Sequence, residues 1–259
     1  MLTTLTRLSP LRAQTLCLLL WLATGWVGLP VANAEPLRVV TEEFSPYNMT
    51  ENGKITGLST EVVQAVLAEV GETAPIQVMP WARAYDMALH EENVLIYSIT
   101  RSPEREPLFN WVGLIVSTHT CLYSSAARPV HLNSLEDARR YQIGTVKDDV
   151  GEEYLTARHF TVGENLQSSS KYELNYDKLK GGRVDLWISD DRNAAYLARQ
   201  AGDQPERVLV QSLPLADLGE DLSLAFSLKT PQATVERYRA ALEAIHRNGK
   251  YDAIMRKWL

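Results

Sequence analysis

Apolar residues follow a strand-like and then a helix-like spacing along the first part of the chain, and the two kinds of segment alternate. Extended segments are predicted at 37–41, 76–79 and 94–96. A helix is predicted over 59–71, ending in a glycine, and a second one begins after Pro80. One face of the first helix carries these apolar residues: Val62, Val63, Val66, Leu67 and Val70. Alternating strands and helices predict an α/β protein with a mostly parallel sheet.

The alternation restarts after a long extended run at 114–124. The elements predicted beyond it are a short helix from Ser134, strands at 141–146, 184–188 and 222–228, and helices at 151–158, 173–180, 191–201 and from Pro231 to the end, with a break at Asn248-Gly249. No low-complexity linker joins this second α/β unit to the first. We therefore expect two lobes with a cleft between them, a preferred place for small-ligand pockets.

The first 34 residues have the three parts of a secretory signal peptide. Arg7 and Arg12 supply the positive charge, an apolar stretch follows at 16–29, and residues 32–34 (Ala-Asn-Ala) fit the cleavage pattern. The apolar stretch is too short for a membrane span of ~20 residues. We expect export to the periplasm, a mature chain of 35–259, and no membrane insertion after cleavage.

Charge and cysteine content exclude several classes of function. The formal charge of −6 becomes −8 when the two signal-peptide arginines are lost, and no Lys/Arg cluster is present, which argues against a nucleic-acid partner. The five histidines have no metal-ligand spacing, so neither a metal nor a cofactor is predicted. Cys121 is the single cysteine of the mature chain. Its 225 residues can bury a core without a disulfide.

The most informative polar stretch is 98–105, which reads Ser-Ile-Thr-Arg-Ser-Pro-Glu-Arg. It follows the apolar strand at 94–96, so the hydroxyls of Ser98 and Thr100 emerge near the strand's carboxyl end, where α/β sheets place ligands. Arg105 lies a few residues further on. A guanidinium with neighbouring hydroxyl donors can hold a small carboxylate at two points.

Motifs along the whole mature chain occur in a characteristic order. They are Phe44-Ser45-Pro46-Tyr47, Gly57, Thr100 to Arg105, Lys180 to Asp185, and Asn248 to Trp258. In this order the chain resembles the bacterial extracellular solute-binding proteins of family 3, the periplasmic receptors of polar amino-acid import systems. The resemblance implies the type II periplasmic binding protein fold, an α/β fold of two lobes joined by two crossing hinge strands. Lobe 1 would comprise 35–117 and 218–259, and lobe 2 would comprise 118–217.

The resemblance also implies roles for individual residues. Arg105 matches the arginine that grips the ligand's carboxylate, and Thr100 matches the hydroxyl that helps it. Asp190 matches the acid that takes the α-ammonium group. Tyr47 matches an aromatic that packs on the ligand, and Trp81 falls where a second aromatic wall is common. Glu42 lies near an acidic position that would read a second amine.

Two departures from the family pattern bear on the ligand. Residues 148–151 (Asp-Asp-Val-Gly) stand where the family has a Gly-Ser/Thr pair at a helix start. Free N–H groups there, including that of Val150, can bind an anion if Asp149 turns away as an N-cap; alternatively, the ligand presents a cation at that spot. Arg83 adds a positive charge at a helix start expected to face the cleft.

By this resemblance the protein is a non-catalytic monomer without a cofactor. It would capture a small solute, an amino acid or a related amine or carboxylate, and deliver it to the membrane permease of an ABC transporter. Two alternatives stay open. One is a periplasmic dehydratase acting on a cyclic carboxylate, for which Glu42 is the only candidate acid. The other is a ligand-sensing partner of a membrane receptor.

Overall fold

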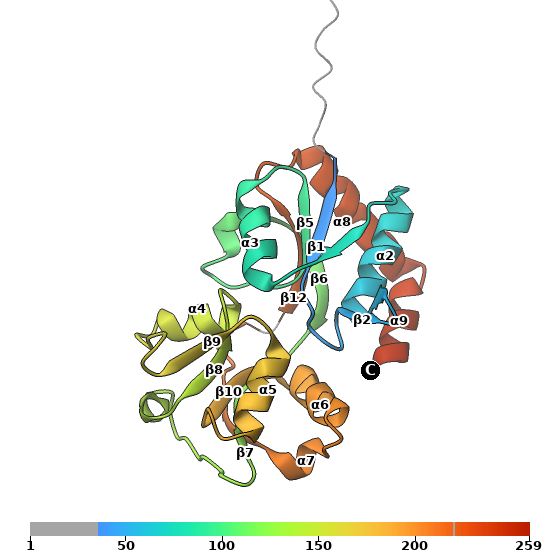
Figure 1. Cartoon of the computed structure of the whole chain (residues 1–259). Coiled ribbons are helices and arrows are strands. Elements are labelled where there is room, and N and C mark those ends of the chain that lie inside the picture. Colours follow the sequence, from blue (N-terminus) through green and yellow to red (C-terminus); the bar gives the residue numbers. More distant parts are fainter. Residues whose placement is uncertain (1–35, 220) are drawn as a thin grey trace, which may run out of the picture. The chain divides into compact units, whose positions relative to one another are not determined.

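Two five-stranded β-sheets carry the fold of this computed structural model, which describes residues 36–219 and 221–259 (Figure 1). The signal peptide predicted at 1–34 lies outside the described residues. A two-stranded hairpin of β2 (Met49–Glu51) and β3 (Lys54–Thr56) accompanies the sheets.

The first sheet has the strand order β4-β1-β5-β12-β6. Its strands are β1 (Arg38–Thr41), β4 (Ile76–Val78), β5 (Val94–Thr100), β6 (Phe109–Ser117) and β12 (Asp221–Ser227). The strand β1 runs parallel to β4 and β5, whereas β12 is antiparallel to β5 and β6. The strand β12, which comes late in the sequence, therefore lies between β5 and β6 in the first sheet.

Helices cover both faces of the first sheet, with α3 on one side and α2, α8 and α9 on the other (Figure 1). Their bounds are α2 (Leu58–Val70), α3 (Trp81–His90), α8 (Gln232–Arg247) and α9 (Lys250–Trp258). Their inward faces are apolar, as the sequence spacing predicts. On α8, for example, the ring of Tyr238 packs edge-on against Phe226 of β12 at a centroid distance of 4.9 Å.

The second sheet has the order β11-β7-β10-β8-β9. Its strands are β7 (Thr120–Ser125), β8 (Ile143–Val146), β9 (Leu166–Ser169), β10 (Leu186–Asp190) and β11 (Leu209–Pro214). The strand β8 is parallel to β9 and β10, and β7 is antiparallel to β10 and β11. The helices of this part are α4 (Val150–Thr156), α5 (Tyr172–Lys180), α6 (Asp191–Gln200) and α7 (Pro205–Val208), with a short 3-10 turn at η2 (Glu136–Arg140). Another 3-10 turn, η1 (Glu106–Leu108), connects β5 and β6 of the first sheet.

Two crossing segments connect the sheets, which confirms the type II periplasmic binding protein architecture. One runs from β6 to β7 through residues 118–119, and the other runs from β11 to β12 through residues 215–220, of which 220 is not described. The second crossing is hydrogen-bonded to the chain just after the first one, because the N–H of Leu215 donates to the carbonyl of Thr120, the first residue of β7, at 2.9 Å. The lobe boundaries at 117/118 and 217/218 stay a prediction.

The structure corrects several predicted elements. The extended run at 114–124 is two strands in different sheets, interrupted at Thr118-His119. The strand predicted at 184–188 lies at 186–190, because Asp190 continues the ladder and pairs with Thr120. The sequence pattern missed β9, β11 and α7. Among the described residues, no helix combines the length and apolar character needed to cross a membrane.

Candidate functional site

A cavity lies between residues of the two sheets, at the ends of their strands. On the side of the first sheet, the cavity is lined by the end of β5 and the start of α3. On the side of the second sheet, it is lined by the end of β10 and the turn between β8 and α4. The carboxyl ends of strands are where α/β sheets place small-ligand pockets.

Asp190 ends β10 and lies at the floor of this cavity, 5% exposed. Its Oδ1 atom accepts from the Tyr47 hydroxyl at 2.6 Å and from the N–H groups of Arg192 and Asn193 at 3.1 Å, which makes Asp190 the N-cap of α6. Its Oδ2 atom has no hydrogen-bond partner within the described residues. Burial raises the pKa of Asp190 to about 6.

Aromatic rings from both lobes meet at one wall of the cavity. Phe44 stacks on Tyr172, the first residue of α5, with a centroid distance of 4.5 Å, and Phe44 also contacts Tyr47 at 4.9 Å. The turn that holds Phe44 depends on Gly57, which has φ 116° and no room for a side chain, because a Cβ would overlap the Tyr47 carbonyl. That carbonyl accepts from the N–H of Ser59 at 2.9 Å, so the turn also begins α2.

The turn before α4 presents an N-cap and a carbonyl. Asp149 caps the helix by accepting from the N–H of Glu152 at 2.7 Å, while its Oδ2 receives the Tyr172 hydroxyl at 3.3 Å. Asp148 adopts φ 57°, and its carbonyl accepts from the indole N–H of Trp81 at 2.7 Å. Asp149 also lines the cavity, so the same residue caps α4 and faces the cavity.

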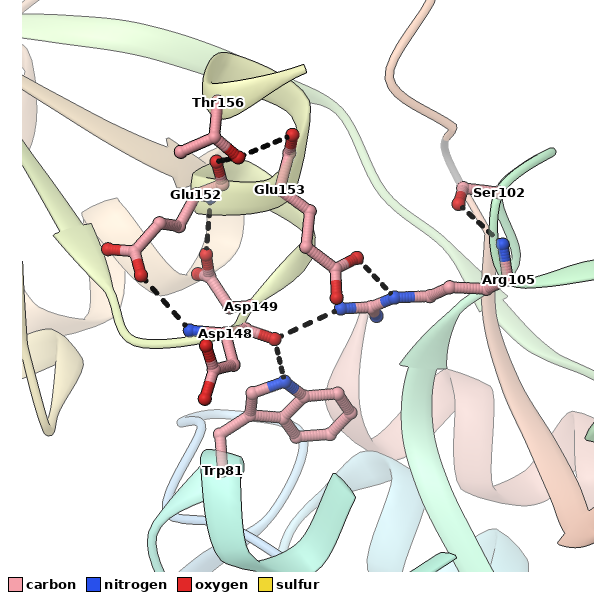
Figure 2. A network of polar contacts seen from close by, with 8 residues as sticks. All are labelled: Trp81, Ser102, Arg105, Asp148, Asp149, Glu152, Glu153 and Thr156. Atoms are coloured by element: carbon pink, nitrogen blue, oxygen red, sulfur yellow. Dashed lines mark hydrogen bonds and ion pairs between the residues drawn. The ribbon is translucent and has the colours of Figure 1, made fainter. Parts of the chain in front are cut away.

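Arg105 is 1% exposed and reaches from the first lobe toward α4 (Figure 2). Its Nε donates to Glu153 Oε2 at 2.8 Å, and its Nη2 donates to the Asp148 carbonyl at 3.3 Å. The guanidinium also lies over the rings of Trp81 and Tyr85, at 5.4 and 4.7 Å from their centroids. The ion pair, the carbonyl and the two rings fix the position of this buried charge.

Acidic side chains dominate the ionisable groups of the cavity. Burial raises the pKa of Glu42 well above its usual value, with a further increase from the nearby Asp149 and a partial offset from Arg105. Burial likewise raises the pKa of Asp149 to about 7. Together with Asp190, these two residues place three carboxyl groups in the lining of the cavity, against the single positive charge of Arg105. In the part of the chain that the structure describes, no group of three or more His, Cys, Asp or Glu residues is arranged to hold a metal ion.

Seven of the residues predicted for the site line the cavity: Glu42, Trp81, Ser98, Thr100, Arg105, Val150 and Asp190. The Ser98 hydroxyl donates to Asn48 Oδ1 at 2.5 Å, so it serves the first lobe itself. Their contact with a ligand stays a prediction.

The structure places two other predicted residues away from the cavity. Tyr47 is fully buried behind Asp190 and is not among the lining residues, so it acts on the site through its hydrogen bond. Arg83 is exposed on α3, because Trp81, Ala84 and Tyr85 form the inward face of that helix and Arg83 falls on the opposite one. The expectation that Arg83 faces the cleft is wrong.

Sequence reasoning missed several residues that build the site. Phe44 was noted as a motif residue but not as a cavity wall, and Tyr172 carried no local signal. Glu153 reads as an exposed acid of an amphipathic helix, yet it is the partner of Arg105. These side chains reach the cavity through the packing of the two lobes, which no local sequence pattern indicates.

Comparisons with known proteins agree with this architecture. The arginine-binding periplasmic protein of Mannheimia haemolytica is 22% identical over 235 residues, covering 88% of this chain and 92% of the relative. An ancestral arginine-binding protein bound to arginine superposes with a TM-score of 0.74 at 21% identity, covering 86% of this chain and 97% of the other. A histidine kinase sensor domain with similarity to periplasmic binding proteins reaches 0.75 at 20% identity, covering 86% and 96%.

The solved structures are too distant in sequence to show more than the fold. The family profile is more decisive, because it matches from the first strand to the C-terminus, residues 37–259. This chain therefore belongs to the bacterial extracellular solute-binding proteins, family 3.

Proposed function

We propose that this protein captures a small polar solute, an amino acid or a related amine or carboxylate, in the cavity between its lobes. It acts in the periplasm as a monomer and delivers the solute to the membrane permease of an ABC transporter. Family membership and the name of the M. haemolytica relative support this proposal. The lobes comprise 35–117 with 218–259, and 118–217.

The observation that carries the proposal is the free oxygen of Asp190. A buried carboxylate oxygen without a hydrogen bond is costly, and an ammonium group of a ligand satisfies both its charge and its hydrogen-bonding capacity. Asp190 shares the cavity with the aromatic pair of Phe44 and Tyr172, whose rings help to exclude water from that contact.

Contacts between the lobes support a closed state that brings the following surfaces together. Besides the bond between Tyr47 and Asp190, Asn193 Nδ2 donates to the Ser45 carbonyl at 2.6 Å. A ligand bound between these contacts adds interactions to both lobes at once, and opening of the hinge releases it.

A thermal-melt screen tests the proposal. The protein, expressed from its full sequence, is unfolded and refolded to strip carried-over ligand and then melted with amino acids, amines and small organic acids. A ligand at about a thousand times its Kd stabilises by ~4 kcal/mol, which for a protein of this size is a shift of about 8–16 °C. A flat screen across all three classes contradicts the proposal.

One comparison favours a second candidate function, in which the protein senses the solute for a membrane receptor. A histidine kinase sensor domain shares the fold. Affinity capture from a membrane extract separates the two, because an importer retains a permease and a sensing partner retains a kinase.

The enzymatic alternative rests on Glu42, whose raised pKa suits a general acid. Incubation with prephenate or arogenate tests it directly. Aromatisation of the ring that disappears with Glu42→Gln establishes the dehydratase, and no aromatisation dismisses it.

A further inference from the structure

The protein itself already provides the acceptors that a carboxylate ligand would offer to Arg105. Glu153 Oε2 takes the Nε hydrogen at 2.8 Å, and the Asp148 carbonyl takes an Nη2 hydrogen at 3.3 Å (Figure 2). Bidentate recognition of a carboxylate needs two free nitrogens along one edge of the guanidinium. The Nε side of this guanidinium is therefore occupied, so a carboxylate can take both hydrogens of the Nε/Nη2 edge only by displacing Glu153.

The turn before α4 holds that arrangement in place. The φ of 57° at Asp148 directs its carbonyl toward the first lobe, where Trp81 Nε1 also donates to it at 2.7 Å. The rings of Trp81 and Tyr85 cover the guanidinium. Glu153, whose side chain is 33% exposed, neutralises the charge of Arg105 without help from a ligand.

The cavity keeps an excess of acid once Arg105 and Glu153 are paired. Glu42, Asp149 and Asp190 line it with exposures of 5–6%, and no other Lys, Arg or His of residues 36–219 and 221–259 does so. Burying several carboxyl groups together is unfavourable unless cations join them. The Oδ2 atom of Asp190 is the clearest acceptor for one, because it is buried and has no partner in the described part of the chain.

The three acids have different hydrogen-bond partners in the cavity. Glu42 and Asp149 both interact with the hydroxyl of Tyr172, whereas Asp190 is hydrogen-bonded to Tyr47. The ring of Phe44, which is stacked on Tyr172, adds an apolar surface to the lining. A ligand with two cationic groups on a short apolar chain can place one group on Asp190 and the other on Glu42 and Asp149.

Building on the proposed function, we propose that the solute is an organic dication without a carboxylate of its own, a diamine or a guanidino-amine. One cationic group binds Asp190, and the other binds Glu42 and Asp149. Glu153 serves as the internal counter-charge of Arg105 and so selects against amino acids, whose carboxylate would compete with it for the guanidinium.

Matched ligand pairs that differ only in the carboxylate test this inference. Calorimetric titration of the full-length protein compares agmatine with arginine, cadaverine with lysine, and putrescine with ornithine. We expect at least one decarboxylated ligand to bind about tenfold more tightly than its amino acid, or tighter still. If every amino acid that binds does so more tightly than its decarboxylated partner, the proposed function stands and this inference is overturned. If none of the six binds, this inference is overturned, and the broader thermal-melt screen decides the proposed function.

A variant of Glu153 tests the mechanism of selection. Glu153→Gln keeps the shape and removes the charge, so Arg105 becomes free to pair with a ligand carboxylate. We expect the affinity for the amino acid, relative to that for its decarboxylated partner, to rise about tenfold. Glu136→Gln is the matched control, because Glu136 pairs with Arg139 on the surface, and it leaves the ratio unchanged. An unchanged ratio in Glu153→Gln overturns the role given to Glu153.

Discussion

Asp190 divides its two oxygens between the fold and the cavity. Oδ1 caps α6 and receives the Tyr47 hydroxyl, whereas Oδ2 is buried and unsatisfied among the described residues. The structural role needs an acceptor, which an amide oxygen also provides, and the binding role needs a negative charge. The two roles can therefore be separated by one substitution.

Replacing Asp190 by asparagine should abolish amine binding and spare the fold. Asparagine caps a helix about as well as aspartate, so the melting temperature changes little. The affinity for an amine falls by about 30-fold or more, because the cation loses its charged partner and meets an amide N–H instead. Calorimetric titration measures the affinity. Asp252→Asn is the control, since Asp252 is exposed on α9 and lies outside the cavity, so this variant keeps the affinity unchanged; an Asp190→Asn protein that binds as tightly as the native one contradicts the assignment.

Binding of a cation should strengthen as the pH rises. Burial raises the pKa of Asp149 to about 7 and that of Asp190 to about 6. Near neutral pH, each carboxyl group is therefore protonated in a fraction of the ligand-free molecules. A bound cation favours the ionised carboxylates and lowers their pKa, so binding releases protons and gains affinity between about pH 5 and about pH 8. The titratable and charged groups facing these acids are Glu42, Tyr47, Arg105, Cys121, Tyr123, Glu152, Tyr172, Asp191 and Arg192.

Calorimetry checks the proton release, because the heat of binding at one pH then differs between buffers of different ionisation enthalpy. An affinity that falls as the pH rises across this range would contradict the raised pKa values.

Side chains near their own motif were predictable, and side chains paired across the lobes were not. Thr100 and Arg105 follow a recognisable strand end, so the sequence placed them at the cavity. The partner of Arg105 lies 48 positions away on α4, and the partner of Tyr47 lies 143 positions away. No local spacing encodes such contacts, which is why Glu153 was missed and Tyr47 was assigned a direct contact.

At the scale of elements, the turn between β1 and the first hairpin positions the site. Its carbonyls accept from the first N–H groups of α2: Pro46 from Leu58 at 3.0 Å and Tyr47 from Ser59 at 2.9 Å. Gly57 makes this approach possible. The same turn places Phe44 against Tyr172, so helix start and cavity wall depend on one glycine.

Gly57→Ala should therefore cost more stability than another glycine in a left-handed conformation. Gly71, the C-cap of α2, has φ 75° and no atom within 4 Å of the place that a Cβ would take, so Gly71→Ala costs only the strain of about 1–2 kcal/mol. Gly57→Ala adds a collision with the Tyr47 carbonyl and displaces Phe44. Denaturant unfolding compares the two variants, and an equal loss of stability would show that the turn relaxes freely.

Elements with strong periodicity were predicted well, and short ones with weak patterns were not. The helix at 58–70 and its glycine cap follow from five apolar positions on one face. The strand β9 reads Leu-Gln-Ser-Ser, with one apolar residue, and β11 ends in a proline and contains a register shift. Their pairing with neighbouring strands, rather than their own sequence, makes them strands.

At the scale of the whole described molecule, the order of strands explains why residues far apart in sequence form one site. Because β12 returns to the first sheet and β7 lies within the second, two crossings carry the chain between lobes and leave the cavity beside them. The order of family motifs along the sequence predicted this topology, since each motif marks a fixed place in it. The chemistry of the pocket, with Arg105 neutralised and three acids remaining, needed the structure.

The most direct test of this account is a crystal structure of the protein with the amine that binds most tightly. We predict a ligand nitrogen within about 3 Å of Asp190 Oδ2 and a second cationic group beside Glu42 and Asp149, with Glu153 still bound to Arg105. A ligand bound outside the cavity, or one whose cationic groups lie away from Asp190, would contradict the account.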